Sequence, residues 1–182
     1  MKLLVVTSNA HKADEIRSYF DESVEVIDVR LDCPESRDED VGEIARAKAA
    51  FAWKELGEPL IVDDTSFSLD ALGGFPGPYA AYVFNKIGNE GILRLISGKR
   101  NSAHFMTAIA YADENGIRVF RGVLSGIIVE PRGGEGFGYD PIFEWEGKTL
   151  AEIPLAEKSR ISHRARALAN FHDWFIGYTG TR

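Results

Sequence analysis

One short stretch, Pro59 to Thr65, constrains the fold more than any other part of the chain. Its apolar run, residues 60–62, leads directly into two adjacent carboxylates, Asp63 and Asp64, and then a hydroxyl. The run predicts a short buried strand that ends at the acidic pair. Successive strand side chains point to opposite faces, so both carboxylates cannot serve one site by simple geometry. Carboxylates in such a place bind a metal, cap a helix or act in acid–base chemistry, and this stretch alone leaves all three open.

Length and composition indicate one globular domain, residues 1–182, that can bury a sizeable core and carry two lobes without a separate linker. The single cysteine, Cys33, excludes an internal disulfide and a Cys-rich zinc site. A net charge of -7 argues against a partner such as a nucleic acid polymer, but a local basic cluster or a divalent cation can still hold a small anion. No apolar run is long enough for a membrane span and no signal-peptide pattern is present, so we expect a cytoplasmic protein.

The first half of the chain alternates strand and helix patterns. Expected elements are a strand at 3–6, a helix with its apolar face at Ile16 to Phe20, a strand at 24–29, and a helix at 43–56 closed by Gly57. With the strand that follows, this alternation predicts α/β layering.

The second half reads as a meander. A short helix is expected at 91–96, then strands at 103–112 and 117–124 joined by a turn at Asn115-Gly116, and a third strand at 125–130. Antiparallel pairs added to the first half predict a mixed sheet.

The turn after the first strand carries Thr7, Ser8, Asn9 and Lys12. Ser8 or Asn9 can cap the next helix, whose N-terminus together with Lys12 would attract an anion. An ordinarily capped helix with a solvated lysine explains the same residues.

The glycine-rich stretch 133–141 has the most unusual composition in the chain. Its glycines permit close backbone approach to a ligand, Phe137 and Tyr139 offer stacking faces, and Asp140 before Pro141 is expected to be extended with its carboxylate displayed. A nucleobase would use these features, whereas a structural loop whose aromatics plug the core would need only the glycines and rings.

The last helix begins against a local rule. Ser162 is a natural N-cap, yet His163 and Arg164 then occupy the first turn, where the helix dipole disfavours cations unless an anion or polar ligand is close. Natural sequences break such rules mainly where function compensates, although a structural histidine explains His163 as well.

Taken together, these stretches resemble the inosine triphosphate pyrophosphatase family, also called the Ham1-like or non-standard purine nucleoside triphosphate pyrophosphatases. The resemblance runs nearly end to end, and the acidic loop looks closest to archaeal members. It rests on Thr7-Ser8-Asn9 with Lys12 and Glu15, Glu35, Asp63-Asp64-Thr65, Gly74-Phe75-Pro76-Gly77, Phe137-Gly138-Tyr139-Asp140-Pro141, Glu157-Lys158-Ser159, and Ser162-His163-Arg164.

The resemblance implies a two-lobed α/β fold with a long central mixed β-sheet flanked by helices, a nucleotide cleft between the lobes, a homodimer, and Mg²⁺-dependent hydrolysis of ITP, dITP and XTP to monophosphate and pyrophosphate. It implies catalytic roles for Asp64 and Lys12 and metal binding by Glu35 and Asp64. The substrate-binding set that it implies is Thr7, Ser8, Asn9, Lys12 and Thr65, with Phe137, Gly138, Tyr139, Asp140, Lys158, His163 and Arg164 on the base and sugar side.

The assignment of Asp64 to metal and water leaves Asp63 as its partner. Asp63 is expected to hold Lys12 or a backbone N–H in place, or to join the metal shell through a water molecule. One departure from the family pattern is Ser66, which stands where the family usually has glycine and would alter the local geometry if a positive φ is needed.

The alternative functions are a Maf-like pyrophosphatase for modified pyrimidine nucleotides and a non-catalytic nucleotide-binding protein. The aromatic stretch 75–82 either packs in a second subunit or lines the cleft.

Overall fold

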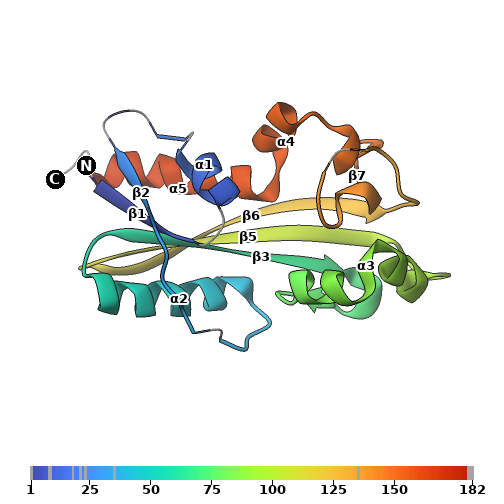
Figure 1. Cartoon of the computed structure of the whole chain (residues 1–182), viewed down its shortest axis with the longest axis horizontal. Coiled ribbons are helices and arrows are strands. Elements are labelled where there is room, and N and C mark those ends of the chain that lie inside the picture. The colour runs from blue at the N-terminus through green and yellow to red at the C-terminus, as the bar shows by residue number, and fades with distance from the viewer. Residues whose placement is uncertain are drawn as a thin grey trace. The chain divides into compact units, whose positions relative to one another are not determined.

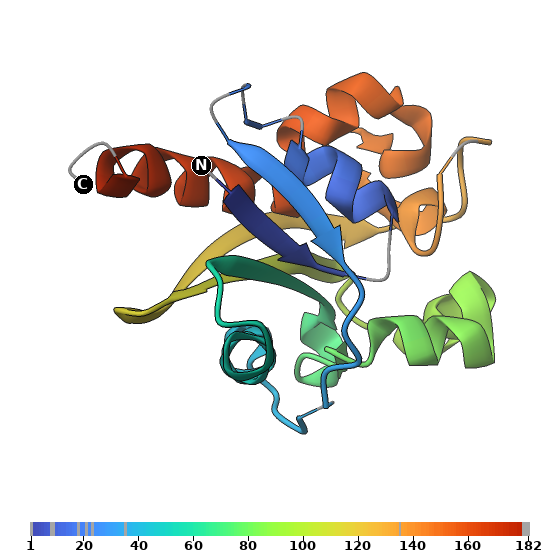
Figure 2. The same ribbon diagram turned by 60° about the vertical axis from the view of Figure 1, so that its left-hand side comes forward.

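The sheet organises the fold, and helices flank it (Figures 1 and 2). The computed structural model describes residues 2–7, 10–17, 19–20, 22, 24–34, 36–134 and 136–179. Its strands are β1 (Lys2–Val6), β2 (Glu25–Val29), β3 (Leu60–Leu69), β4 (Pro76–Gly77), β5 (Ser102–Asp113), β6 (Gly116–Ile128), β7 (Phe143–Trp145) and β8 (Lys148–Thr149). Its helices are α1 (Ala10–Arg17), α2 (Val41–Leu56), α3 (Ala80–Ile96), α4 (Leu155–Ile161) and α5 (His163–Thr179), with 3-10 turns at Asp70–Leu72, Asp140–Ile142 and Leu150–Glu152.

The sheet is mixed, as predicted. Within the described residues its strand order is β2-β1-β3-β5-β6-β7-β8, with β4 paired to β3. β1 runs parallel to β2 and β3, whereas β7 is antiparallel to both β6 and β8. The parallel strands come from the alternating first half and the antiparallel ones from the meander, so the two halves of the sequence build one α/β sheet of both kinds.

The chain divides into two compact units. The first unit contains Met1–Asp64, Thr107–Gly122 and Arg164–Arg182, and the second contains Thr65–Met106 and Val123–His163. The predicted nucleotide cleft between two lobes stays a prediction.

In the first unit, α2 covers one face of the sheet while α1 and α5 cover the other (Figures 1 and 2). Its core joins β1, β3 and α5 through buried side chains such as Leu3, Ile61 and Phe171. α2 begins at Asp40, whose carboxylate accepts from the N–H of Gly42, and it ends at Gly57 in the left-handed conformation. The helix therefore starts two residues before the predicted Glu43 and ends where predicted.

In the second unit, α3 and α4 lie on opposite sides of the strands (Figure 1). The core of this unit is rich in rings, including the fully buried Phe67 and Phe143. The predicted helix at 91–96 was far too short, because α3 starts at Ala80 and continues past a non-helical Gly88. The apolar pattern at 91–96 covers only the part of α3 that follows this glycine.

The predicted strand end at the acidic pair is wrong. β3 continues through Asp63 and Asp64 to Leu69 because residues 66–69 are buried and two of them pair with β4.

The hairpin at Asn115-Gly116 is confirmed, but the predicted third strand at 125–130 is wrong, since β6 runs unbroken to Ile128. α4 was not predicted. Within the described residues, no helix combines the length and the apolar character needed to cross a membrane.

Candidate functional site

The first group of candidate residues is an ion cluster around Asp63 in the first unit. Its carboxylate is 1% exposed and contacts two cations, the Nζ of Lys12 from α1 and the Nε of Arg164 from α5, the latter at 2.9 Å. Lys12 Nζ also donates to the backbone carbonyl of Asp63 at 3.3 Å. Asp63 therefore contacts Lys12, which is one of the partners predicted for it. The helix dipole disfavours a cation such as Arg164 in the first turn of α5. The carboxylate of Asp63 beside Arg164 offsets this effect.

The charges around Asp63 outweigh the cost of its burial. Burial alone would raise the pKa of the Asp63 carboxyl, but Lys12 and Arg164 offset that effect and hold the pKa well below its usual range. Asp63 is therefore ionised at neutral pH and keeps both cations in place.

Asp64 has a different partner on the opposite face of β3. Its Oδ2 lies 2.8 Å from the Nζ of Lys48, which α2 supplies. The alternation of strand side chains thus separates the acidic pair as predicted, with Asp63 directed to α1 and α5 and Asp64 directed to α2. Lys48 was missed by sequence reasoning. The signal that could have found it is its place on the inner side of a strongly predicted helix that precedes the acidic strand.

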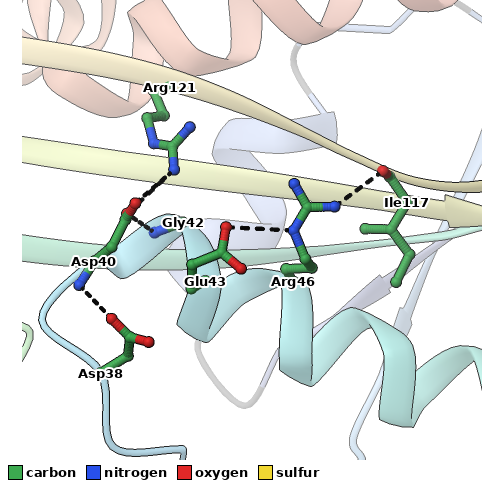
Figure 3. A network of polar contacts seen from close by, with 7 residues as sticks. All are labelled: Asp38, Asp40, Gly42, Glu43, Arg46, Ile117 and Arg121. Atoms are coloured by element: carbon green, nitrogen blue, oxygen red, sulfur yellow. Dashed lines mark hydrogen bonds and ion pairs between the residues drawn. The ribbon is translucent and has the colours of Figure 1, made fainter.

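α2 is fixed at the end where it begins. Arg121 of β6 places its guanidinium against both carboxylate oxygens of Asp40, at 2.9 and 3.2 Å, and Asp40 accepts from Gly42 N at 2.7 Å (Figure 3). One turn further on, Arg46 donates to the carbonyl of Ile117 at 3.2 Å (Figure 3). A Cβ at Gly42 would lie 2.1 Å from Arg121 Nη2, so glycine leaves room for this contact. The helix that carries Lys48 is therefore tied to β6 at successive turns.

A second group of candidate residues lies in the second unit, around the glycine-rich loop. Asp140 is 4% exposed, and its Oδ2 forms an ion pair with Lys158 of α4 and accepts from Phe137 N at 2.9 Å. The prediction that Asp140 is extended with its carboxylate displayed is wrong. The residue begins a 3-10 turn, and its carboxylate is buried against Lys158 and the N–H of Phe137. Lys158 Nζ lies 4.6 Å from the centroid of the Phe137 ring.

The loop offers a single exposed ring. Phe137 is 75% exposed, whereas Tyr139 is 5% exposed. The Tyr139 hydroxyl donates to the carbonyl of Ala80 at 2.8 Å, and burial raises its pKa to about 12, so it stays a donor. Asn89, just after the break in α3, donates to the carbonyl of Gly138 at 3.1 Å. Thus α3 holds the loop backbone, and of the two predicted stacking faces Phe137 supplies the accessible one.

His163, the first residue of α5, has its ring orientation set by packing. The imidazole stacks on the buried ring of Phe105, with centroids 5.0 Å apart and planes 21° apart. Ser162 precedes it with an extended backbone, the conformation that an N-cap requires.

Comparison with protein-family profiles matches residues 3–174 to the Ham1 family. The chain belongs to the Ham1 family.

Relatives of this Ham1 family member carry consistent names. A dITP/XTP pyrophosphatase of the archaeon Methanopyrus kandleri is 46% identical over 183 residues, which is 96% of each chain. A dITP/XTP pyrophosphatase of Thermococcus kodakarensis is 44% identical over 96% of this chain and 97% of its own length. The solved structure of the Staphylococcus aureus Ham1 protein has a TM-score of 0.90 at 27% identity and covers 98% of this chain and 100% of its own.

The remaining predicted positions of this Ham1 family member divide into two groups. Thr7, directly after β1, and Thr65, next to Asp64 in β3, are half-buried. Ser8, Asn9 and Glu35 lie outside the described residues, as does the side chain of Glu15. Ser66 lies within extended β3 and is not a positive-φ residue, so the departure from the family glycine introduces no backbone strain.

A divalent cation fits the donor set. The described residues contain no group of three or more His, Cys, Asp or Glu side chains that could hold a metal by themselves. Mg²⁺ does not need such a cage, because it commonly binds one or two carboxylates together with substrate phosphates and waters. Asp64, whose side chain is 20% exposed, provides one carboxylate of this kind.

Proposed function

We propose that this Ham1 family member hydrolyses the non-standard purine nucleoside triphosphates ITP, dITP and XTP to the monophosphate and pyrophosphate, and so cleanses the nucleotide pool. The observation that carries the proposal is that β3 presents adjacent carboxylates to different cations, Asp63 to Lys12 and Arg164, and Asp64 to Lys48. Such a charge pattern suits a polyanion that arrives with a divalent cation. The names of the relatives support the same reaction.

The triphosphate is proposed to bind at the cationic side chains of the first unit. Lys12 and Lys48 keep 21% and 15% of their side chains exposed. Asp63 holds Lys12 before substrate arrives, which reduces the reorganisation needed to receive a phosphate. Thr7, Ser8 and Asn9 would add hydroxyl, amide and backbone donors next to Lys12.

The cation is proposed to be Mg²⁺, held by Glu35 and Asp64 together with the triphosphate. When bound, it would neutralise phosphate charge and make a bound water more acidic. Asp64 would orient or deprotonate the attacking water at the α-phosphorus, with pyrophosphate as the leaving group. Lys12 and the N-terminus of α1 would stabilise the charge that develops on that group.

Base recognition is proposed for the loop and the start of α5. Phe137 provides the exposed face for stacking, and Tyr139, Asp140 and Lys158 hold the loop in shape. Donors from His163 or Arg164 would meet the 6-oxo group that hypoxanthine and xanthine share. Arg164 can do so while its Nε engages Asp63, because a guanidinium has further N–H groups.

Adenine and guanine are rejected for different reasons in this proposal. A 6-amino group would leave the donors of the site unpaired, a penalty of about 1–3 kcal/mol. The 2-amino group of guanine must instead meet a blocked or unmatched surface.

The assay that tests the proposal measures pyrophosphate release from ITP with and without Mg²⁺. We expect Mg²⁺-dependent release and a higher kcat/KM for ITP and XTP than for GTP and ATP. A Maf-like enzyme would instead prefer modified pyrimidine nucleotides, and a non-catalytic binder would bind ITP without releasing pyrophosphate. Equal values for the four purine nucleotides would refute the claim of discrimination.

We further propose that the protein is a cytoplasmic homodimer that acts on free nucleotides rather than on nucleic acid polymers. Support for the dimer comes from apolar side chains that α3 and the segment before it expose. Phe75, Tyr79, Tyr82, Ile87 and Leu95 are 44%, 51%, 65%, 40% and 40% exposed. Exposed apolar side chains of this size, where they form one patch, commonly mark a protein–protein contact.

A further inference from the structure

Four aromatic rings of the second unit stack in series. Tyr139 lies on Phe67 with centroids 4.3 Å apart and planes 23° apart. Phe67 lies on Phe105 at 4.7 Å and 34°, and Phe105 lies on His163 at 5.0 Å and 21°. We call Tyr139, Phe67, Phe105 and His163 the ring column. Its members come from the glycine-rich loop, β3, β5 and the start of α5.

The interior of the ring column is closed to solvent. Phe67 is 0% exposed and Phe105 is 8% exposed. Phe143 packs against both, at centroid distances of 6.3 Å from Phe67 and 4.8 Å from Phe105. Close-packed interiors transmit a change in side-chain volume to the neighbouring groups rather than absorbing it. The distance between the two ends of the ring column is therefore set by the two phenylalanines.

Both ends of the ring column belong to the segments that we assign to the base. Tyr139 is flanked by Gly138 and Asp140, and its hydroxyl is fixed to the carbonyl of Ala80. His163 has its imidazole plane aligned within 21° of Phe105. A hydrogen bond weakens steeply when donor direction or distance changes, so the position of His163 relative to the loop decides which base edge is satisfied.

We propose that Phe67 and Phe105 are positioning residues for base selection: they fix the separation and relative orientation of the loop at Tyr139 and the imidazole of His163. This inference rests on the proposed function and deepens it. Neither phenylalanine is assigned to the triphosphate, since the cations assigned to it, Lys12 and Lys48, belong to the first unit. Their substitution is expected to act on the choice between bases more than on the hydrolysis itself.

The test replaces Phe105 with Leu and compares kcat/KM for ITP and GTP. The control is Phe175→Leu, because Phe175 is 1% exposed and lies in the core of the other unit. Both variants lose a buried ring, so both lose stability. Only Phe105→Leu should lower the ratio of kcat/KM for ITP over GTP, by about fivefold, which corresponds to about 1 kcal/mol of activation free energy. The change should appear in KM for ITP more than in kcat.

A spectroscopic measurement checks the mechanism in the folded variant. The Cε1 proton of His163 should move downfield when Phe105 becomes Leu, because the ring current of the stacked phenyl is lost. It should not move in Phe175→Leu. Phe67→Leu provides the same selectivity test at the neighbouring ring if Phe105→Leu does not fold.

The outcomes separate this inference from the proposed function. A wild-type protein that releases no pyrophosphate from ITP would overturn both. A wild-type protein that prefers ITP, with Phe105→Leu and Phe67→Leu keeping the wild-type ratio, would overturn the inference and leave the proposed function intact. A fall in the ratio of equal size in Phe175→Leu would also overturn it, since loss of stability would then explain the effect.

Discussion

At the scale of single residues, adjacent carboxylates on one strand have separate duties. Asp63 is buried between Lys12 and Arg164, whereas Asp64 is partly exposed beside Lys48. Strand alternation alone predicted that the two side chains would diverge, but it could not say which cation each would meet. Those partners come from α1, α2 and α5, and long-range contacts of this kind are not encoded in local spacing.

Substitution of the two carboxylates should therefore have unequal effects. Asp64→Ala should reduce turnover of ITP below about 1% of wild type, because it removes the group assigned to orient the water. Asp63→Ala should retain about 1–10%, because it removes only the charge-assisted contacts that hold Lys12 and Arg164. Steady-state pyrophosphate release at saturating Mg²⁺ measures both. Equal losses would mean that the pair acts as one unit.

The depressed pKa of Asp63 predicts a pH dependence of stability. Since its folded-state pKa lies below the unfolded value of about 3.9, its ion pairs stabilise the fold above that pH and lose this effect as the pH falls toward the folded-state pKa. Urea unfolding at pH 7 and pH 3 should show a larger deficit of Asp63→Asn relative to wild type at pH 7. A deficit that stays constant between the two pH values would contradict the assignment.

At the scale of elements, the helices that carry site residues are held by polar contacts at their ends. α2 is the clearest case, since Asp40 caps it and Arg121 neutralises the cap from β6 (Figure 3). α2 and β1 were predicted within two residues because their caps and apolar patterns are local. α3 and the full length of β3 were not, because a glycine break and a strand continuing past two acids depend on tertiary burial.

Loss of the α2 cap should be measurable. Asp40→Ala should lower the free energy of unfolding by about 1–2 kcal/mol, because the helix loses its N-cap and Arg121 loses its partner. Glu43→Ala is the matched control, since Glu43 forms an exposed pair with Arg46 of the same helix, and it should cost less than about 0.5 kcal/mol. Chemical denaturation followed by circular dichroism compares the two. Equal costs would show that the cap does not secure the helix.

At the scale of the whole molecule, the chain forms two compact units, and each unit combines segments that lie far apart in the sequence. The sequence motifs alone do not indicate which unit each segment joins. The resemblance identified the family correctly, whereas the burial of Tyr139 and Asp140 became apparent only from the packing of their loop. Composition could identify an unusual glycine-rich stretch, but it could not distinguish a ring that stacks on a ligand from one that stacks on Phe67.

The proposed dimer gives a test at this scale. Wild-type protein at micromolar concentration should elute as a dimer in size-exclusion chromatography with light scattering. Tyr82→Arg should shift it toward the monomer, because Tyr82 is 65% exposed on the proposed contact and a charge there would be buried on association. Arg100→Ala, a substitution at an exposed residue beyond α3, should leave the dimer unchanged. A monomeric wild type would refute the dimer.

The uninterrupted course of β3 also limits how the sequence can vary. The strand is paired with β1 before the acidic pair and with β4 after it, so its register is fixed on both sides of Asp63 and Asp64. Insertion or deletion of one residue between Leu60 and Asp63 would exchange the faces of the two carboxylates, giving Lys12 the wrong one. A change in the length of a neighbouring loop would not have this effect, so the constraint falls on the spacing within the strand.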